Sequence, residues 1–337
     1  MKKPYIIAEV SQNHDGSLGQ AHAFIDAVAS TGANAIKFQT HIADEESTLG
    51  EPFRTKFSYE DATRFDYWKR MEFTEEQWRG LYDHAKEKGL DFLSSPFSVK
   101  ALEMLNRIGC QAWKFGSGEV FNDVLLDKAI STGKQIYLST GLSAVQDIDN
   151  QVERIKQNGN DFVIFHCTTE YPSSAESIAL NRIREIENRY NCSVGLSDHS
   201  GTIYPSLAAV TLGAEFIEVH VTMSKWMFGP DVIASVTIDE LSQIVEGADF
   251  IYRTLQNPDK RIELKDGKKE LKRIFSKSLY AGENIEKGTV LNESNIAIKK
   301  PYVNDGVPVS AYSEIMGKKL KNKLTKDQPI KWEDIEK

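Results

Sequence analysis

The sequence predicts an α/β protein: a (β/α)8 TIM barrel followed by a small β-rich domain. Eight short apolar segments alternate with amphipathic, helix-like stretches over about 255 residues, which matches such a barrel in both count and size. The segments are almost continuously apolar, as parallel strands buried on both faces are. A doubly wound sheet is the alternative, but no glycine-rich dinucleotide fingerprint follows the first segment.

The eight apolar segments are the expected strands, and they lie at 5–10, 35–40, 91–95, 112–117, 135–140, 162–168, 193–198 and 216–222. Between them, residues 19–31 carry apolar side chains at helical spacing and stop before a glycine. Residues 74–88 begin with Thr74, a predicted N-cap followed by two acidic residues. Residues 143–157 form a third predicted helix. Polar residues gather where the strands end, and that end of a barrel carries the active site.

The barrel pattern stops near residue 258, so we assign residues 1–258 to the barrel. Residues 259–272 are charged and contain one glycine, which indicates a linker. From residue 273 onward, short β-type segments with turn signals predict an independent domain over 273–337. Residues 261–337 hold 17 Lys and Arg against 12 Asp and Glu, although the whole chain has a net charge of −8. A small basic module is expected to close over an anionic site or to dock on another subunit.

The composition excludes several classes of protein. The acidic balance, 41 Lys and Arg against 49 Asp and Glu, argues against a nucleic-acid partner. Three cysteines without a CxxC spacing predict neither a disulfide framework nor a structural zinc site. The amino-terminal apolar run ends at Glu9, too early for a signal peptide, and no stretch approaches the ~20 apolar residues of a membrane span. We therefore expect a cytoplasmic protein without a membrane partner.

Small hydroxyl residues and glycines stand at three consecutive strand ends, in FLSSPFS, KFGSGE and YLSTGL. Backbone N–H groups beside glycine, together with serine and threonine hydroxyls, form anion-binding nests. Any one of these residues is more simply explained as a cap for the next helix. Three such motifs in series, with Lys37 and Lys114 on the strands, favour a site for a phosphate and a carboxylate.

Two histidines follow neighbouring strands, His199 after the seventh and His220 within the eighth. Glu218 and His220 share one face of their strand because side chains alternate. Two imidazoles at adjacent strand ends can bind a divalent metal and leave positions for water and substrate. The alternative is one buried histidine with a satisfied N–H and one general base.

Two acidic residues stand near the same predicted barrel mouth. Glu9 ends the first strand, where burial requires a partner. Lys37 is a candidate partner, and hydrogen bonding to substrate hydroxyls is the functional alternative. Asp231 lies in a tight loop after the eighth strand. It is expected either to reach over the barrel mouth or to cap the helix beginning near Thr237.

Taken in order, the motifs AEVSQNHDG, IKFQTH, SSPFS, WKFGSGE, LSTGL, FHCTTEYPSS, GLSDHS, EVHVT and GPD closely resemble those of the sialic acid synthase family. These enzymes are phosphoenolpyruvate-dependent synthases of N-acetylneuraminate and related nine-carbon sugars. The resemblance spans essentially the whole chain, and residues from about 273 resemble the antifreeze-like (SAF) domain that ends these enzymes. The resemblance implies a domain-swapped homodimer in which the SAF domain of one subunit lines the active site of the other.

The resemblance also implies a role for each matching position. Those matching the phosphoenolpyruvate-binding residues of the family are Lys37, Ser95, Lys114, Ser117, Ser139 and Ser197. His199 and His220 match the ligands of a divalent metal, Mn²⁺ or Mg²⁺. Glu9 and Asp231, the predicted catalytic residues, match residues that contact the acceptor sugar near the metal. Gln39 and Tyr171 match residues lining the acceptor side.

Two positions depart from the neuraminate synthases. Thr169 replaces an asparagine, and Lys300 stands where an SAF-domain arginine meets the N-acetyl group of the sugar. Arginine and lysine are not interchangeable where a fork of donors is needed. The acceptor is expected to be an N-acyl hexosamine, either N-acetylmannosamine or a 2,4-diacetamido-2,4,6-trideoxyhexose, and these two departures favour a modified hexosamine over N-acetylmannosamine.

The expected reaction is a metal-dependent condensation of phosphoenolpyruvate with the open-chain sugar aldehyde, releasing phosphate. A second hypothesis is a Schiff-base aldolase on the same barrel, with Lys37 or Lys114 as the nucleophile. A third is a carbohydrate-binding protein without catalytic activity. The convergence of polar residues on one barrel face favours the synthase.

Overall fold

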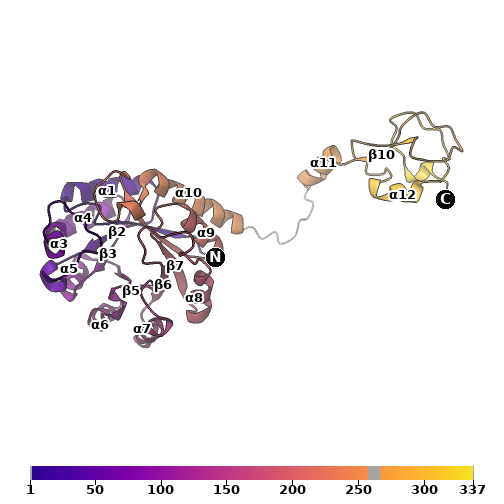
Figure 1. Ribbon diagram of the computed structural model, residues 1–337. Coiled ribbons are helices and arrows are strands. Elements are labelled where there is room, and N and C mark those ends of the chain that lie inside the picture. The colour runs from indigo at the N-terminus through magenta and orange to yellow at the C-terminus, as the bar shows by residue number, and fades with distance from the viewer. Residues whose placement is uncertain (1, 257–265, 337) are drawn as a thin grey trace. The chain divides into compact units, whose positions relative to one another are not determined.

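The computed structural model describes residues 2–256 and 266–336, and the chain divides into two compact units, Met1–Asn257 and Pro258–Lys337. The first unit is a closed barrel in which β1 to β8 pair in sequence order, all parallel, and β1 also pairs with β8 (Figure 1). The predicted fold class is confirmed. The strands are β1 (Tyr5–Ser11), β2 (Ala35–Thr40), β3 (Asp91–Pro96), β4 (Ala112–Phe115), β5 (Gln135–Ser139), β6 (Phe162–Cys167), β7 (Ser193–Asp198) and β8 (Phe216–Thr222).

Helices connect successive strands and cover the outside of the barrel (Figure 1). They are α1 (Leu18–Ser30), α2 (Ala43–Glu46), α3 (Arg64–Met71), α4 (Glu75–Glu87), α5 (Val99–Ile108), α6 (Asp123–Ile130), α7 (Val145–Gln157), α8 (Arg182–Tyr190), α9 (Tyr204–Leu212) and α10 (Ile238–Leu255). Two short 3₁₀ turns, η1 (Glu119–Phe121) and η2 (Val232–Ala234), and the short strand β9 (Val236–Thr237) complete the unit. No helix in the described residues is long and apolar enough to cross a membrane.

All eight predicted strands form, with ends that differ by at most two residues. The N-cap predicted at Thr74 is also present, at the start of helix α4. The Thr74 side chain accepts from the Gln77 N–H, and the Gln77 side-chain oxygen accepts from the Thr74 N–H. Helix α7 begins at Val145, later than predicted, because the Asp147 carboxylate accepts from the Ala144 N–H and fixes the start there. Local capping therefore sets the helix ends.

Side-chain alternation divides the barrel interior into two layers. A lower layer is apolar, where Ile7, Leu93, Tyr137, Val163 and Phe165 form a cluster separate from the main core between strands and helices. Two residues further along, the inward positions of β1 to β5 and of β8 carry charged or hydroxyl side chains instead, namely Glu9, Lys37, Ser95, Lys114, Ser139 and Glu218. The apolar layer closes the barrel from below, so those polar groups meet at its upper mouth.

The second unit is small and mostly irregular. It contains α11 (Asp266–Phe275), β10 (Ser278–Ala281), β11 (Ile296–Lys299), η3 (Val309–Ala311), α12 (Tyr312–Ile315) and η4 (Trp332–Asp334). Strands β10 and β11 pair antiparallel around a core that includes Leu279, Leu291 and Ile330. Residues 259–265 of the predicted linker lie outside the described residues, and the remainder of it, from Asp266, belongs to helix α11.

Candidate active site

Strand register places the first charged residues of the barrel mouth side by side. Glu9 of β1 is level with Lys37 of β2 on one side and with His220 of β8 on the other. The backbone bulges just beyond Glu9, and Ser11 adopts a left-handed φ of 52°. Such strain in a non-glycine residue persists only where the surroundings enforce it, as at functional sites.

Two lysines and two carboxylates form a buried, charge-balanced cluster. Lys37 Nζ lies 2.8 Å from Glu9 Oε2 and 3.6 Å from Glu218 Oε2. Lys114 Nζ lies 2.8 Å from Glu218 Oε1. The side chains of all four residues are at most 3% exposed. Each buried charge has an opposite partner, as burial requires.

Burial and neighbouring charges oppose one another in this cluster. Burial alone would raise the pKa of Glu9, but Lys37, His220 and Lys114 hold it well below its usual range. Burial would likewise lower the pKa of Lys37, but Glu218 and Glu9 raise it. Lys37 is therefore held as a cation and Glu9 as an anion, a state suited to binding an anionic group beside a fixed carboxylate.

Serine hydroxyls complete this cluster. Lys37 donates to Ser95 Oγ at 3.3 Å, and Lys114 donates to Ser139 Oγ at 2.9 Å. Ser197 donates to Glu218 Oε1 at 2.8 Å. We call Lys37, Lys114, Glu218 and these three serines the donor cluster, because all except Glu218 are positions predicted to bind the substrate donor, phosphoenolpyruvate.

Ser117, the remaining predicted anion-binding residue, stands in the loop after β4. Its Oγ accepts from the Gly141 N–H at 3.2 Å. A side chain at position 141 would meet Thr169 Oγ1 at 2.2 Å and Ser117 Oγ at 2.6 Å. The three loops approach so closely that only glycine fits there.

The two predicted metal ligands lie together, with ring centroids 5.1 Å apart. His199 Nδ1 donates to the Thr168 carbonyl oxygen at 2.9 Å, which leaves Nε2 as the nitrogen that can bind a ligand. His220 Nδ1 is buried without a hydrogen bond, 3.9 Å from Asp231 Oδ2, and His220 Nε2 is 3.6 Å from Glu9 Oε2. An unpartnered imidazole nitrogen beside a carboxylate fits a divalent cation.

The described residues contain no cluster of three or more His, Cys, Asp or Glu side chains arranged to hold a metal by themselves. A cation here would therefore take two imidazoles from the protein and its other ligands from water or substrate. That is the composition expected of an open catalytic site and not of a structural one.

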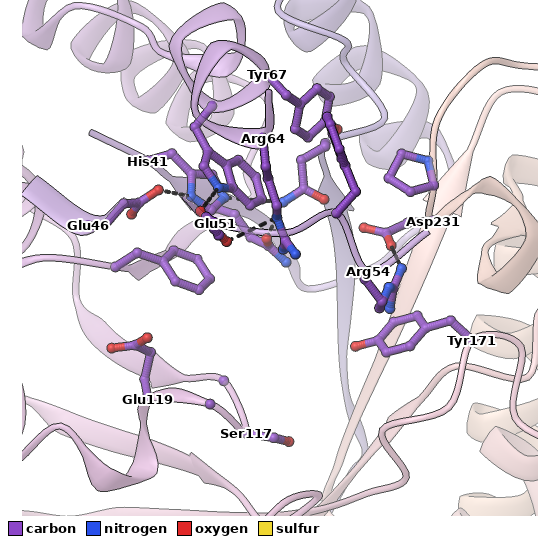
Figure 2. A pocket seen from close by; sticks show the side chains of 18 of the residues that line it. His41, Glu46, Glu51, Arg54, Arg64, Tyr67, Ser117, Glu119, Tyr171 and Asp231 are labelled. Atoms are coloured by element: carbon purple, nitrogen blue, oxygen red, sulfur yellow. Dashed lines mark hydrogen bonds and ion pairs between the residues drawn. The ribbon is translucent and has the colours of Figure 1, made fainter. Parts of the chain in front are cut away.

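Asp231 reaches the barrel mouth, while Thr237 caps helix α10, so the first of the two alternatives for Asp231 holds. Asp231 Oδ2 accepts from Ser11 Oγ at 2.6 Å, and its Oδ1 lies 3.2 Å from an Arg54 nitrogen. The Arg54 guanidinium stacks 4.2 Å from the centre of the Tyr171 ring (Figure 2). Tyr171 in turn lies against His199, with ring centroids 4.2 Å apart.

A cavity of about 540 Å³, lined in part by His220, opens at the barrel mouth. Figure 2 shows it with Tyr171 and Asp231 on one side. Its lining includes the predicted site residues Gln39, Ser117, Tyr171, His220 and Asp231, together with Thr169. It also includes residues from the segment 41–68, between β2 and the middle of α3, and Phe97 and Glu119. These added residues are rich in aromatic rings and carboxylates. The cavity is large enough for a monosaccharide with acyl substituents.

The barrel thus gathers every predicted site residue of the first unit around one mouth. Lys300 lies in the second unit, where its Nζ stands 5.3 Å from the centre of the Phe275 ring. Sequence reasoning assigned no role to Glu218, although alternation put it on the same face as His220. It also missed Arg54 and His41, which belong to a long connection whose path only the tertiary structure shows.

The fold and site define a parallel (β/α)8 barrel with a buried cluster of lysines, carboxylates and serines at its mouth, followed by a small second unit, and comparisons give its family. Residues 24–260 match the NeuB family, and residues 276–336 match the SAF domain. The N,N'-diacetyllegionaminic acid synthase of Campylobacter jejuni is 34% identical over 337 residues, covering 98% of this chain and 100% of the relative. The pseudaminic acid synthase of Helicobacter pylori is 30% identical, covering 100% of this chain and 99% of the relative.

Among solved structures, the N-acetylneuraminic acid synthetase of Leptospira borgpetersenii superposes with a TM-score of 0.70 at 30% identity. The match covers 80% of this chain and 90% of that chain. The chain belongs to the NeuB family of nonulosonic acid synthases, so the predicted family is confirmed.

Proposed function

We propose that the protein condenses phosphoenolpyruvate with an N-acylated mannosamine-type sugar to a nine-carbon 2-keto acid and releases phosphate. The observation that carries this proposal is the donor cluster beside a histidine pair at one barrel mouth. Two buried lysines with serine hydroxyls suit the phosphate and carboxylate of the donor. The adjoining cavity of about 540 Å³ suits the acceptor.

In the proposed reaction, carbon 3 of phosphoenolpyruvate attacks the open-chain aldehyde carbon, and the aldehyde oxygen takes a proton. Water adds at carbon 2, and the resulting tetrahedral centre expels phosphate by breaking its C–O bond. Lys37 and Lys114 hold the donor in register, so that much of the rate enhancement comes from positioning and electrostatics. Glu9 and Asp231 orient the acceptor hydroxyls.

His199 and His220 would hold a Mn²⁺ or Mg²⁺ ion, which supplies Lewis-acid polarisation of the aldehyde when bound. The fit rests on the free nitrogen of each imidazole and on the nearby carboxylates of Glu9 and Asp231.

The relatives' names and the aromatic lining of the cavity favour a 2,4-diacetamido-2,4,6-trideoxyhexose over N-acetylmannosamine as acceptor. Trp68 and Phe97 provide apolar surface for a deoxy methyl or a second acyl group. Thr169 in place of asparagine is consistent with a changed acceptor.

For Lys37, the Schiff-base alternative conflicts with the electrostatics of the cluster. An aldolase lysine must be neutral to attack a carbonyl, whereas Glu218 and Glu9 raise the pKa of Lys37. Borohydride trapping with pyruvate separates the two reactions, because only the aldolase forms a covalent adduct.

The test is a phosphate-release assay with phosphoenolpyruvate, Mn²⁺ and both acceptors. We expect stoichiometric phosphate and keto acid, with no turnover after exhaustive chelation or in His220→Ala. Full turnover after chelation would overturn the metal assignment. Tight sugar binding without phosphate release by the wild type would favour a binding protein instead.

We further propose a cytoplasmic, domain-swapped homodimer in which Lys300 reaches the partner's acceptor cavity. Mixing Lys114→Ala with Lys300→Ala subunits tests this arrangement. Activity restored in the mixed dimers supports it, and its absence in a confirmed heterodimer contradicts it.

A further inference from the structure

His41, just beyond β2, is held between two aromatic rings at the wall of the cavity. Its ring is stacked on Trp68 at a centroid distance of 4.0 Å and on Phe97 at 4.4 Å, in both cases 17° from parallel. Its Nδ1 lies 2.6 Å from Glu46 Oε1, and the residue is 3% exposed. Figure 2 shows this pair at the end of the cavity away from Tyr171. A ring so tightly held can point its second nitrogen in one direction only.

A chain of hydrogen bonds runs from this pair to the reacting centre. His41 Nε2 lies 3.2 Å from Gln12 Nε2, and the same Gln12 amide nitrogen donates to Gln39 Oε1. Gln39 Nε2 then donates to Glu9 Oε1 at 2.7 Å. Glu46 is thereby linked to Glu9 through three intervening side chains.

The donor and acceptor atoms of these side chains fix the direction of every hydrogen bond in the series from Glu46 to Glu9. The Gln12 amide nitrogen can only donate, so His41 Nε2 accepts and Nδ1 carries the hydrogen that Glu46 accepts. Gln39 uses its carbonyl oxygen toward Gln12, so its NH₂ must face Glu9. Turning the Gln39 amide over would oppose its oxygen to the Glu9 carboxylate and its nitrogen to the Gln12 nitrogen. Both contacts would then be repulsive.

We propose that Glu46 and His41 are positioning residues that fix the Gln39 amide and thereby orient Glu9 toward the acceptor. This inference rests on the role proposed above for Glu9. Glu9 is held at Oε2 by Lys37 and at Oε1 by Gln39. Without a directed Gln39 N–H, the Glu9 carboxylate is free to rotate toward Lys37 and away from the acceptor.

Steady-state kinetics of three variants test this series of hydrogen bonds. His41→Phe retains a ring between Trp68 and Phe97 but removes both nitrogens, and Glu46→Leu removes the terminal acceptor. We expect kcat to fall about 10- to 100-fold in each, with the KM for phosphoenolpyruvate unchanged. Glu46→Gln keeps an acceptor oxygen and should retain more kcat than Glu46→Leu. Equal losses in these two variants would contradict the directional mechanism.

Asp44→Asn is the matched control. Asp44 lies on the same short helix, α2, and is 66% exposed and paired with Lys69 at 2.6 Å, outside the chain of hydrogen bonds. We expect wild-type kcat from it. A loss equal to that of Glu46→Leu would mean that any change in this helix disturbs the site, and the proposal would fail.

Non-additivity distinguishes positioning from a general structural role. In a Gln39→Leu background the chain is already broken, so adding His41→Phe should cost no further kcat. Independent, multiplying losses would show that His41 does not act through Gln39.

A readout without turnover separates this proposal from the function on which it rests. With ¹⁵N-glutamine labelling, the Gln39 side-chain NH₂ resonances should shift in His41→Phe and Glu46→Leu but not in Asp44→Asn. Unshifted resonances in the first two variants would contradict the proposed series of hydrogen bonds even if the wild type is an active synthase. A wild type that releases no phosphate would contradict the proposed function, and the resonances would still test the hydrogen bonds.

Discussion

The two halves of the barrel mouth are built differently. The donor cluster stands on strands, where Lys37, Lys114 and Glu218 point inward because alternation and register leave them no other direction. The cavity proposed for the acceptor takes much of its wall from residues 41–68, a long connection that reaches Asp231 through Arg54. Strands hold a binding site rigidly, whereas loops allow it to vary. In the proposed reaction, phosphoenolpyruvate would therefore bind at the strand-built half and the sugar acceptor at the loop-built half.

The largest expected effect is on the strand-built half. Lys114→Ala removes a cation from the donor cluster and should lower kcat/KM for phosphoenolpyruvate by about 100-fold, mainly through KM. It also leaves the buried Glu218 without its closest cationic partner, so Tm should fall. Lys128→Ala is the control, because Lys128 is exposed on α6, where it pairs with Glu103.

A double variant separates binding from stability at this position. Lys114→Ala with Glu218→Gln removes both charges and should restore most of the lost Tm, because no unpaired charge remains. Phosphoenolpyruvate binding should stay weak. Recovery of tight donor binding in the double variant would remove Lys114 from the donor site.

Substitutions in the loop-built half should change the KM for the acceptor and not the KM for phosphoenolpyruvate. Arg54→Ala breaks the ion pair with Asp231 and the stacking on Tyr171. We expect the acceptor KM to rise about 10-fold, with the phosphoenolpyruvate KM unchanged. Lys56→Ala, two residues along the same connection and exposed, should behave as wild type. A rise in both KM values would show that the halves are not separate.

The smallest expected effect is a change in Tm, and it concerns the ion pairs that anchor residues 41–68. Arg70 binds Asp61 at 2.8 Å and Asp15 at 2.6 Å. Burial alone would raise the pKa of Asp61, but hydrogen bonds from Arg70 and Ser58 lower it. A carboxyl whose pKa is lowered in the folded state adds stability above its unfolded pKa, about 3.9, and loses it as the pH falls.

Asp61→Asn should therefore lower Tm by about 2 to 4 °C at pH 7, and the difference should shrink as the pH falls below the unfolded pKa of about 3.9. Thermal unfolding at several pH values measures it. Glu60→Gln is the control, since Glu60 is 65% exposed and lies 3.6 Å from Arg70. A pH-independent difference would show that the Asp61 charge is not its origin.

Much of the donor half was predictable from sequence because its rules are local. The polar ends of the apolar segments placed Lys37, Ser95 and Lys114 at the barrel mouth before any coordinates. The importance of Glu218 was not predictable, because its partners lie on β2, β4 and β7. Arg54 was missed for another reason: no periodic pattern marks its segment, and only packing brings it to Asp231.

The sequence by itself determined the barrel, the order of its strands and the identity of the polar groups at their ends, because hydrophobic periodicity and capping act over a few residues. Tertiary structure alone decided which opposite charges meet. It decided that Asp231 lies at the barrel mouth and does not cap helix α10. It also decided that Glu46 reaches Glu9 through three side chains. Such contacts join residues far apart in the chain, and their geometry exists only after the barrel has closed.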